Sequence, residues 1–145
     1  MPTTQATCEW KQEEPAVEKW DRQEENSELK AEIGEANKLA ENWDDEGSPA
    51  YSKDTLDRAA AFLTMQSDTV KKHHGLILPV PRILPGPDGS IDIHWKRQGW
   101  ELLVNIPSDP SEMAVFYGDD YGSSKIKGSL DPKDFNLGIA AWLMR

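Results

Sequence analysis

Two short runs of acids carry the residue types that could do chemistry in this sequence. One run covers residues 44–46, and the other is the pair Asp119 and Asp120. Paired carboxylates can bind a divalent metal ion or transfer protons, and His94 on a predicted strand is a further candidate ligand or base. Acids in turns also form ordinary Asx turns, so both interpretations stay open. Neither run has the spacing of a calcium-binding loop.

The short motifs of the common enzyme classes are missing from the sequence. It has no G-x-G-x-x-G, no Walker lysine loop, no G-x-S-x-G and no H-E-x-x-H. His73 and His74 are neighbours and would project about 100° apart on a helix, so they chelate one metal ion poorly. Cys8 is the single cysteine and has no second cysteine to pair with. The sequence therefore assigns no catalytic residue, no metal ligand and no cofactor.

The negative charge of the chain is concentrated at its N-terminal end. The 145 residues have a net charge of −10, and the first 50 residues alone hold fourteen acids and five bases. Direct binding to a nucleic-acid backbone needs clustered lysine and arginine, which argues against that function. No apolar run approaches the roughly 20 residues of a membrane span, and residues 1–11 lack the apolar region of a secretory signal. We expect a cytoplasmic protein that does not enter a membrane.

Residues 1–25 are predicted to form a flexible acidic arm, interrupted by Pro15. Tryptophans are unusual in a purely solvating tail, because exposing them to water is unfavourable. The arm therefore either folds back onto the body or docks on a partner protein with a basic surface. The candidate partner-binding residues are Trp10, Val17, Trp20, Glu24 and Glu25.

Residues 26–145 are predicted to form one α+β domain, because helices and strands are grouped rather than alternating along the chain. The expected order is an N-terminal helical hairpin, an antiparallel meander of three to four strands, and a C-terminal helix. Apolar spacing and cap residues predict helices over 27–45, 52–72 and 132–144, and strands over 90–96, 100–106, 113–117 and 125–130. Ser52 and Gly75 are the predicted caps of the second helix. The alternating residues of the first two strands that are expected to face the helices are Ile91, Ile93, Trp95, Trp100, Leu102, Val104 and Ile106.

Three local features refine this layout. Gly34 lies inside the first predicted helix, where close approach of another backbone would explain a glycine. The proline-rich residues 76–88 suit an extended segment or an edge strand. Asp131 followed by Pro132 predicts the start of the last helix, as N-cap and first helical residue.

The run from Asn42 to Pro49 resembles the N-W-D-x-x-G turn of a group of small, uncharacterised bacterial proteins. The resemblance extends over roughly residues 29–106 and implies a bacterial or phage origin and a helix–helix–sheet order, but no activity. A structural explanation is also available, in which the tryptophan closes the first helix and the glycine provides a positive φ. The motif residues are Trp43, Asp44, Asp45 and Gly47.

The function that these observations favour is a non-enzymatic, protein-binding regulator or accessory subunit, of the antitoxin or inhibitor kind. One alternative is an enzyme that uses Asp44, Asp119 and Asp120 together with His94. A second alternative is an acidic mimic of nucleic acid, which requires a continuous negative stripe. The residues of that stripe would be Glu24, Glu25, Glu28, Glu32, Glu35 and Glu41.

Overall fold

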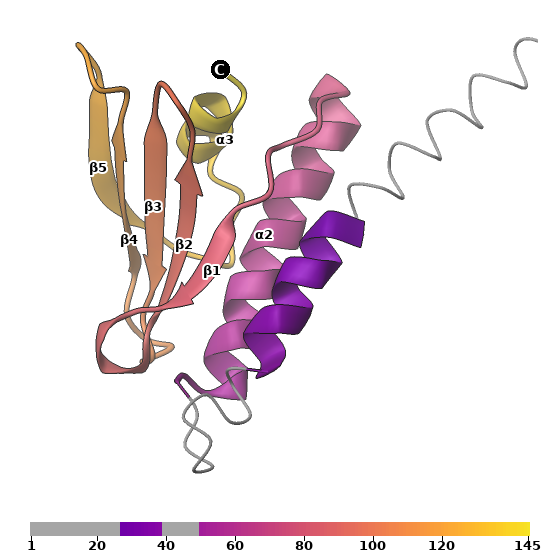
Figure 1. The fold of residues 1–145 in the computed structure, drawn as a ribbon, viewed down its shortest axis with the longest axis vertical. Coiled ribbons are helices and arrows are strands. Elements are labelled where there is room, and N and C mark those ends of the chain that lie inside the picture. The colour runs from indigo at the N-terminus through magenta and orange to yellow at the C-terminus, as the bar shows by residue number, and fades with distance from the viewer. Residues whose placement is uncertain (1–26, 39–49) are drawn as a thin grey trace, which may run out of the picture.

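The computed structural model describes residues 27–38 and 50–145 of the chain. Helices cover one face of a five-stranded antiparallel sheet, which is an α+β architecture (Figure 1). Residues 27–38 are helical. The other elements are α2 (Lys53–His74), β1 (Arg82–Pro85), a 3₁₀ turn (Pro87–Gly89), β2 (Ile91–Lys96), β3 (Glu101–Ile106), β4 (Ala114–Asp119), β5 (Lys125–Leu130) and α3 (Leu137–Leu143).

The sheet is a meander in which each strand pairs with its neighbour in sequence, in the order β1-β2-β3-β4-β5. The expected α+β class and antiparallel meander are confirmed. The expected number of three to four strands is wrong, because the proline-rich segment contributes β1 as an additional edge strand. Its backbone pairs Ile83 with Ile93, so the apolar alternation of the central strands continues into β1.

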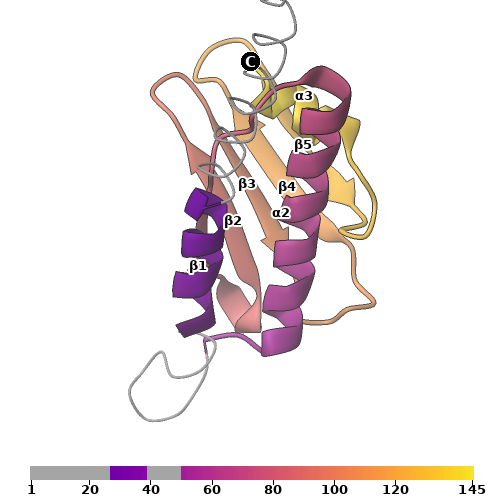
Figure 2. The same cartoon turned by 90° about the vertical axis from the view of Figure 1, so that its right-hand side faces the viewer.

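The helices lie against one face of the sheet (Figure 2), and the residues of the hydrophobic core pack between them and the strands. The alternating residues of β2 and β3 expected to face the helices are buried there, including Ile93, Trp95 and Val104. Tyr51, just before α2, is also buried and donates a hydrogen bond of 2.7 Å to the carbonyl oxygen of Ala36. This bond joins the start of α2 to the helix over residues 27–38.

The caps of α2 match the sequence prediction. Ser52 is the N-cap, and its hydroxyl accepts a hydrogen bond of 3.1 Å from the amide of Thr55. Gly75 ends the helix with a left-handed backbone, φ 65°, which glycine adopts without a steric penalty.

Within the described residues, the explanation expected for Gly34 is wrong. A side chain at Gly34 would meet nothing within 4 Å, so close approach of a described backbone does not explain that glycine.

The last helix begins later than its sequence signals predict. α3 starts after Asn136, whose side-chain oxygen accepts a hydrogen bond from the Ile139 amide. Asp131 caps no helix, and its carboxylate instead accepts a hydrogen bond from the Lys133 amide in a turn. The expected start at residue 132 is therefore wrong. The start is set by Gln66 of α2, which bonds both the amide and the carbonyl group of Asn136.

Several sequence predictions fall on residues outside the described ranges. They are the acidic arm (residues 1–25), the end of the first predicted helix, and the motif turn with Trp43, Asp44, Asp45 and Gly47. Among the helices in the described ranges, none combines the length and apolar character that crossing a membrane requires.

Candidate interaction surface

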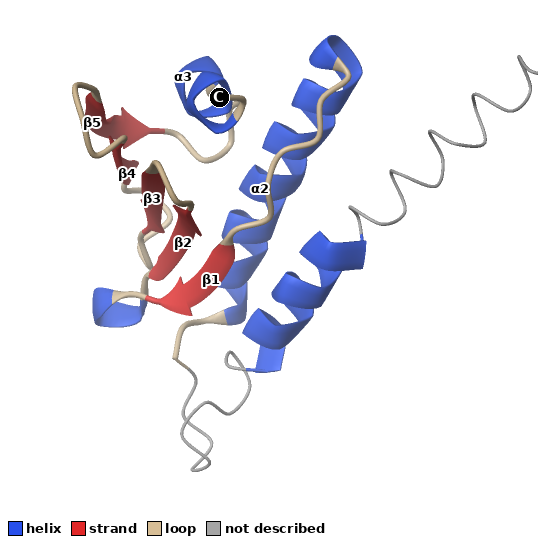
Figure 3. Ribbon diagram, turned by 45° about the horizontal axis from the view of Figure 1, so that its top comes forward, coloured by secondary structure: helices blue, strands red, loops and turns tan. Residues whose placement is uncertain are grey.

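One face of the sheet carries none of the helices in the described ranges. In Figure 1 the helix over residues 27–38, α2 and α3 all lie on the same side of the strands. The view in Figure 3 shows the same arrangement from another direction. We call the opposite side the open face. It presents the second set of alternating side chains from each strand, the set that points away from the core.

The strand register arranges the open face in three rows. The first row contains Lys96, Glu101, Asp119 and Lys125, in the order β2 to β5. The second row contains Arg82, His94, Leu103, Tyr117 and Lys127, in the order β1 to β5. The third row contains Leu84, Asp92, Asn105, Val115 and Ser129, also from β1 to β5.

Apolar and aromatic side chains gather on the half of this face formed by β3, β4 and the turn after β4. Leu103 is half-buried, while Val115, Tyr117 and Tyr121 are 53%, 41% and 51% exposed. These four residues are named the tyrosine patch. Leu103 lies directly across from Tyr117 in the β3–β4 register, so the apolar area crosses both strands.

The two tyrosines of the patch are held by carboxylates. The Tyr121 hydroxyl donates to Glu101 Oε2 at 2.7 Å, and the Tyr117 hydroxyl donates to Asp119 Oδ2 at 3.1 Å. His94 Nε2 lies 3.0 Å from the other oxygen of Glu101. Hydrogen bonds to an ionised acceptor are stronger than neutral ones. The rings are therefore fixed by their hydroxyl ends, while part of each ring remains accessible to solvent.

The backbone of Tyr121 adopts an uncommon conformation that contributes to this arrangement. Its φ is 62°, in the left-handed region that large side chains rarely occupy. The Tyr121 amide donates to Asp119 Oδ1 at 2.7 Å, which stabilises the turn. The turn returns the aromatic side chain to Glu101 on β3. Backbone strain of this kind, worth about 1–3 kcal/mol, is concentrated at functional sites.

The same hydrogen bonds shift the ionisation of the patch. The bond to Glu101 raises the pKa of Tyr121 to about 12, and the bond to Asp119 raises the pKa of Tyr117. The hydrogen bond from Tyr121, followed by that from His94, lowers the pKa of Glu101. Burial raises the pKa of Tyr51 to about 12. All three tyrosines of the chain therefore have raised pKa values.

An ultraviolet titration of tyrosine ionisation tests this geometry. In the folded protein we expect Tyr121 to ionise near 12 rather than at its ordinary value of 10.0. Because the pKa of Tyr121 is higher in the folded than in the unfolded chain, its hydrogen bond to Glu101 stabilises the fold. That contribution is complete below pH 10 and is lost as the pH rises through about 12. Glu101→Gln should lower the pKa of Tyr121 towards its ordinary value and leave Tyr51 unchanged. An unchanged Tyr121 titration in that variant would contradict the hydrogen bond.

The structure brings together some of the residues that the enzyme hypothesis requires and separates others. His94 and Asp119 share the open face and are linked through Glu101 and Tyr121. Asp120 belongs to the turn, where its carboxylate accepts bonds from the Gly122 and Ser124 amides and from Arg145. The Ser124 amide is the main cause of its lowered pKa. Asp44 lies outside the described residues.

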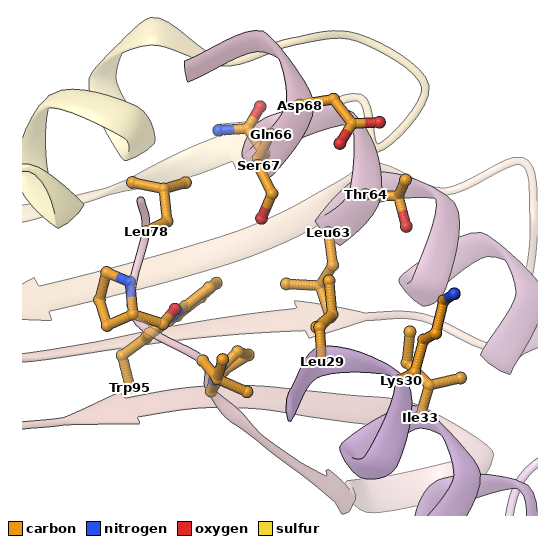
Figure 4. Close-up of a pocket in the computed structure, with 13 residues that line it drawn as sticks. Leu29, Lys30, Ile33, Leu63, Thr64, Gln66, Ser67, Asp68, Leu78 and Trp95 are labelled. Carbon is orange, nitrogen blue, oxygen red and sulfur yellow. The ribbon is translucent and has the colours of Figure 1, made fainter. Parts of the chain in front are cut away.

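Neither His94 nor Asp119 lines any of three cavities in the described region. One, of about 250 Å³, lies between the helix over residues 27–38, α2 and the chain before β1 (Figure 4). Gln66 is the one buried polar side chain among its lining residues, and its amide is already bonded to Asn136. Across residues 27–38 and 50–145, no group of three or more histidines, cysteines and acids could hold a metal ion.

Among the described residues, the negative stripe required by the mimic hypothesis is interrupted at Glu32. Glu32 turns towards the sheet and accepts a hydrogen bond of 2.7 Å from the amide of Ile83. Glu35 is exposed and pairs with Lys38 at 3.3 Å. The stripe residues Glu24, Glu25 and Glu41 lie outside the described residues.

The tyrosine patch was missed by sequence reasoning, although a tyrosine beside Asp119 and Asp120 on a strand end was a usable signal.

The chain was compared with known proteins. It matches no protein-family model, no curated protein and no solved structure.

Proposed function

We propose that this protein is a non-enzymatic regulator or accessory subunit, of the antitoxin or inhibitor kind, that acts in the cytoplasm of a bacterial or phage system by binding another protein. The observation that carries the proposal is the tyrosine patch on the open face. Tyrosine supplies a large, amphipathic contact area with few rotatable bonds and is enriched among the residues that dominate binding energy at interfaces.

Two features of the patch support binding over catalysis. The neighbouring carboxylates of Glu101 and Asp119 accept hydrogen bonds from the tyrosine hydroxyls, which positions the rings before any partner arrives. Fixing contact groups in advance reduces the entropy lost on association. The patch also lies on a broad strand surface rather than in a cavity, which suits a protein partner. The acidic arm, with Trp10 and Trp20, is proposed as a second contact, to a basic area of the partner.

Affinity capture tests this function. The tagged full chain is incubated with an extract of the cells that produce it, and retained proteins are quantified by mass spectrometry. The double variant Tyr117→Ser, Tyr121→Ser should retain the partner at least about tenfold less, because central aromatic residues carry much of the binding energy. Leu137→Ser is the matched control, because Leu137 is 63% exposed and belongs to α3, which lies on the helix side of the sheet (Figure 1). Equal retention by the tyrosine variant, or no specifically retained protein, would refute the proposal.

A further inference from the structure

The two edges of the sheet differ in how their backbone hydrogen-bonding groups are satisfied. In an antiparallel ladder, every second residue of an edge strand bonds to its neighbour, and the others point their N–H and C=O groups outward. The Gly86 amide donates to the Ser90 carbonyl oxygen at 2.8 Å, in line with the β1–β2 register. Because bonded and outward-pointing residues alternate along the strand, the backbone N–H and C=O groups of residues 81, 83 and 85 point away from β2. The Ile83 amide does point outward, because it bonds to Glu32 on the neighbouring helix.

The β1 edge, taken together with Pro81 just before it, offers no free amide hydrogen at its three outward positions. Pro81 and Pro85 have no amide hydrogen to offer. The remaining donor, the Ile83 amide, is occupied by the carboxylate of Glu32, which is 20% exposed. Another strand approaching β1 therefore finds no free donor along its outward edge. Natural sheets use such devices to prevent unwanted pairing.

The β5 edge has the opposite character. The Asp120 amide donates to the Ser124 carbonyl oxygen at 3.1 Å, which fixes the alternation of the β4–β5 ladder. Counting from that pair, Ile126 and Gly128 bond to β4, while the amides and carbonyls of Lys125, Lys127 and Ser129 point outward. These three residues are exposed, and no side chain or backbone in the described ranges bonds to their outward groups.

The side chains of β5 restrict what can pair with it. Lys125 and Lys127 project on the open face, while the half-buried Ile126 lies on the helix side. Symmetric pairing of β5 with a second copy, centred on the lysines, would place Lys125 opposite Lys127, or Lys127 opposite itself. Like charges directly across a strand pair are destabilising, whereas opposite charges are favourable. The edge therefore disfavours self-pairing and favours an acidic strand.

We propose that β5 is the docking edge for an extended segment of the partner protein, in which acidic residues alternate with apolar residues. The segment would add a sixth strand, with its acids beside Lys125 and Lys127 and its apolar side chains beside Ile126. Backbone hydrogen bonds supply affinity and alternate side chains supply specificity in this mode of recognition. The inference rests on the proposed function, because it names the chemistry of the partner.

Binding of a defined peptide to the isotope-labelled full chain tests the proposal by NMR. The probe is acetyl-Thr-Glu-Val-Glu-Val-Glu-Thr-amide, and the matched control peptide has lysine in place of each glutamate. We expect saturable shifts of the amides of residues 125–129 with the acidic peptide below about 2 mM, and none with the lysine peptide. Equal responses to both peptides, shifts centred on β1, or no saturable binding would overturn the proposal.

Hydrogen exchange of the isolated full chain provides a second measurement. The outward amides of Lys125, Lys127 and Ser129 should exchange rapidly, while the Ile83 amide should be protected by its bond to Glu32. Protection of the β5 amides that depends on protein concentration would mean that a second copy occupies the edge. Protection that does not depend on concentration would mean that another part of the same chain does. Either result would overturn the proposed occupant.

Variants of Lys127 separate this inference from the proposed function. Lys127→Pro removes an outward amide hydrogen without removing a bond to β4, and β1 already carries prolines at its outward positions. We expect at least about tenfold weaker peptide binding for Lys127→Pro than for Lys127→Ala. The double variant Lys125→Glu, Lys127→Glu keeps every amide and should prefer the lysine peptide. If Lys127→Pro captures the cellular partner as well as the unmodified chain while the tyrosine variant does not, the edge inference fails and the proposed function stands.

Discussion

Replacement of Gln66 by leucine is expected to lower the free energy of unfolding by about 2–4 kcal/mol. Gln66 is 1% exposed, and its side chain makes two hydrogen bonds to the backbone of Asn136. Its Nε2 donates to the Asn136 carbonyl oxygen at 3.1 Å, and its Oε1 accepts from the Asn136 amide at 2.8 Å. Leucine has a similar size but bonds neither group, so the Asn136 amide loses its partner while the carbonyl oxygen keeps its bond from the Ala140 amide. Equilibrium unfolding in urea, followed by circular dichroism, measures the loss.

Gln66→Glu provides the matched control. An ionised glutamate can still accept the bond from the Asn136 amide but cannot donate to the carbonyl oxygen, so the loss should decrease when low pH protonates the side chain. Because Asn136 is also the N-cap of α3, the leucine variant should increase hydrogen exchange in α3 more than in β2. A loss below about 1 kcal/mol for Gln66→Leu would mean that water replaces both bonds.

The elements that the sequence predicted well are those whose signals are local. Ser52 and Gly75 bound α2 because a capping hydroxyl and a left-handed glycine act on neighbouring backbone groups. Ile91, Ile93 and Trp95 alternate with polar residues along β2, which likewise indicates a strand with one buried face. These features needed no knowledge of the rest of the fold.

The start of α3 was mispredicted because a distant residue decides it. Asp131 and Pro132 form a strong local start signal, yet the helix begins only after Asn136. The buried amide of Gln66, 70 positions away, holds the Asn136 backbone in place. Leaving that amide without partners would be more unfavourable than a later helix start. A tertiary contact therefore overrides the local preference.

The extra strand and the tyrosine patch also depend on relations between strands. The edge-strand alternative for the proline-rich segment is confirmed, but the sequence could not choose it over an extended segment. Pro81, just before β1, and Pro85, its last residue, lie at outward positions where no ladder bond is lost, and only the register with β2 reveals this. The Tyr121 ring reaches Glu101 because of a left-handed backbone at a turn, which the sequence does not announce. The sequence patterns thus predicted the central strands but not the side chains that are fixed on their open face.

Replacement of Trp95 by alanine is expected to lower the free energy of unfolding by about 3–5 kcal/mol, because it removes the largest fully buried side chain of the sheet. Trp95 is 2% exposed, and its Nε1 donates to the Pro79 carbonyl oxygen at 2.8 Å. Its ring also lines the cavity of about 250 Å³ beside α2 (Figure 4), which would become larger. Urea unfolding followed by circular dichroism gives the value, since the other tryptophans complicate fluorescence.

Trp95→Phe separates burial from the hydrogen bond. Phenylalanine keeps most of the buried aromatic area but leaves the Pro79 carbonyl oxygen without its donor, so a smaller loss of about 1–3 kcal/mol is expected.

The bond to Pro79 ties the chain before β1 to β2 and so helps to place Ile83 opposite Ile93, with the Ile83 amide beside Glu32. Both variants should therefore speed hydrogen exchange at Ile83. If Trp95→Phe destabilised the fold as much as Trp95→Ala, the hydrogen bond rather than ring burial would be the main contribution of Trp95. If exchange at Ile83 did not change, the closure of the β1 edge would be independent of the bond to Pro79.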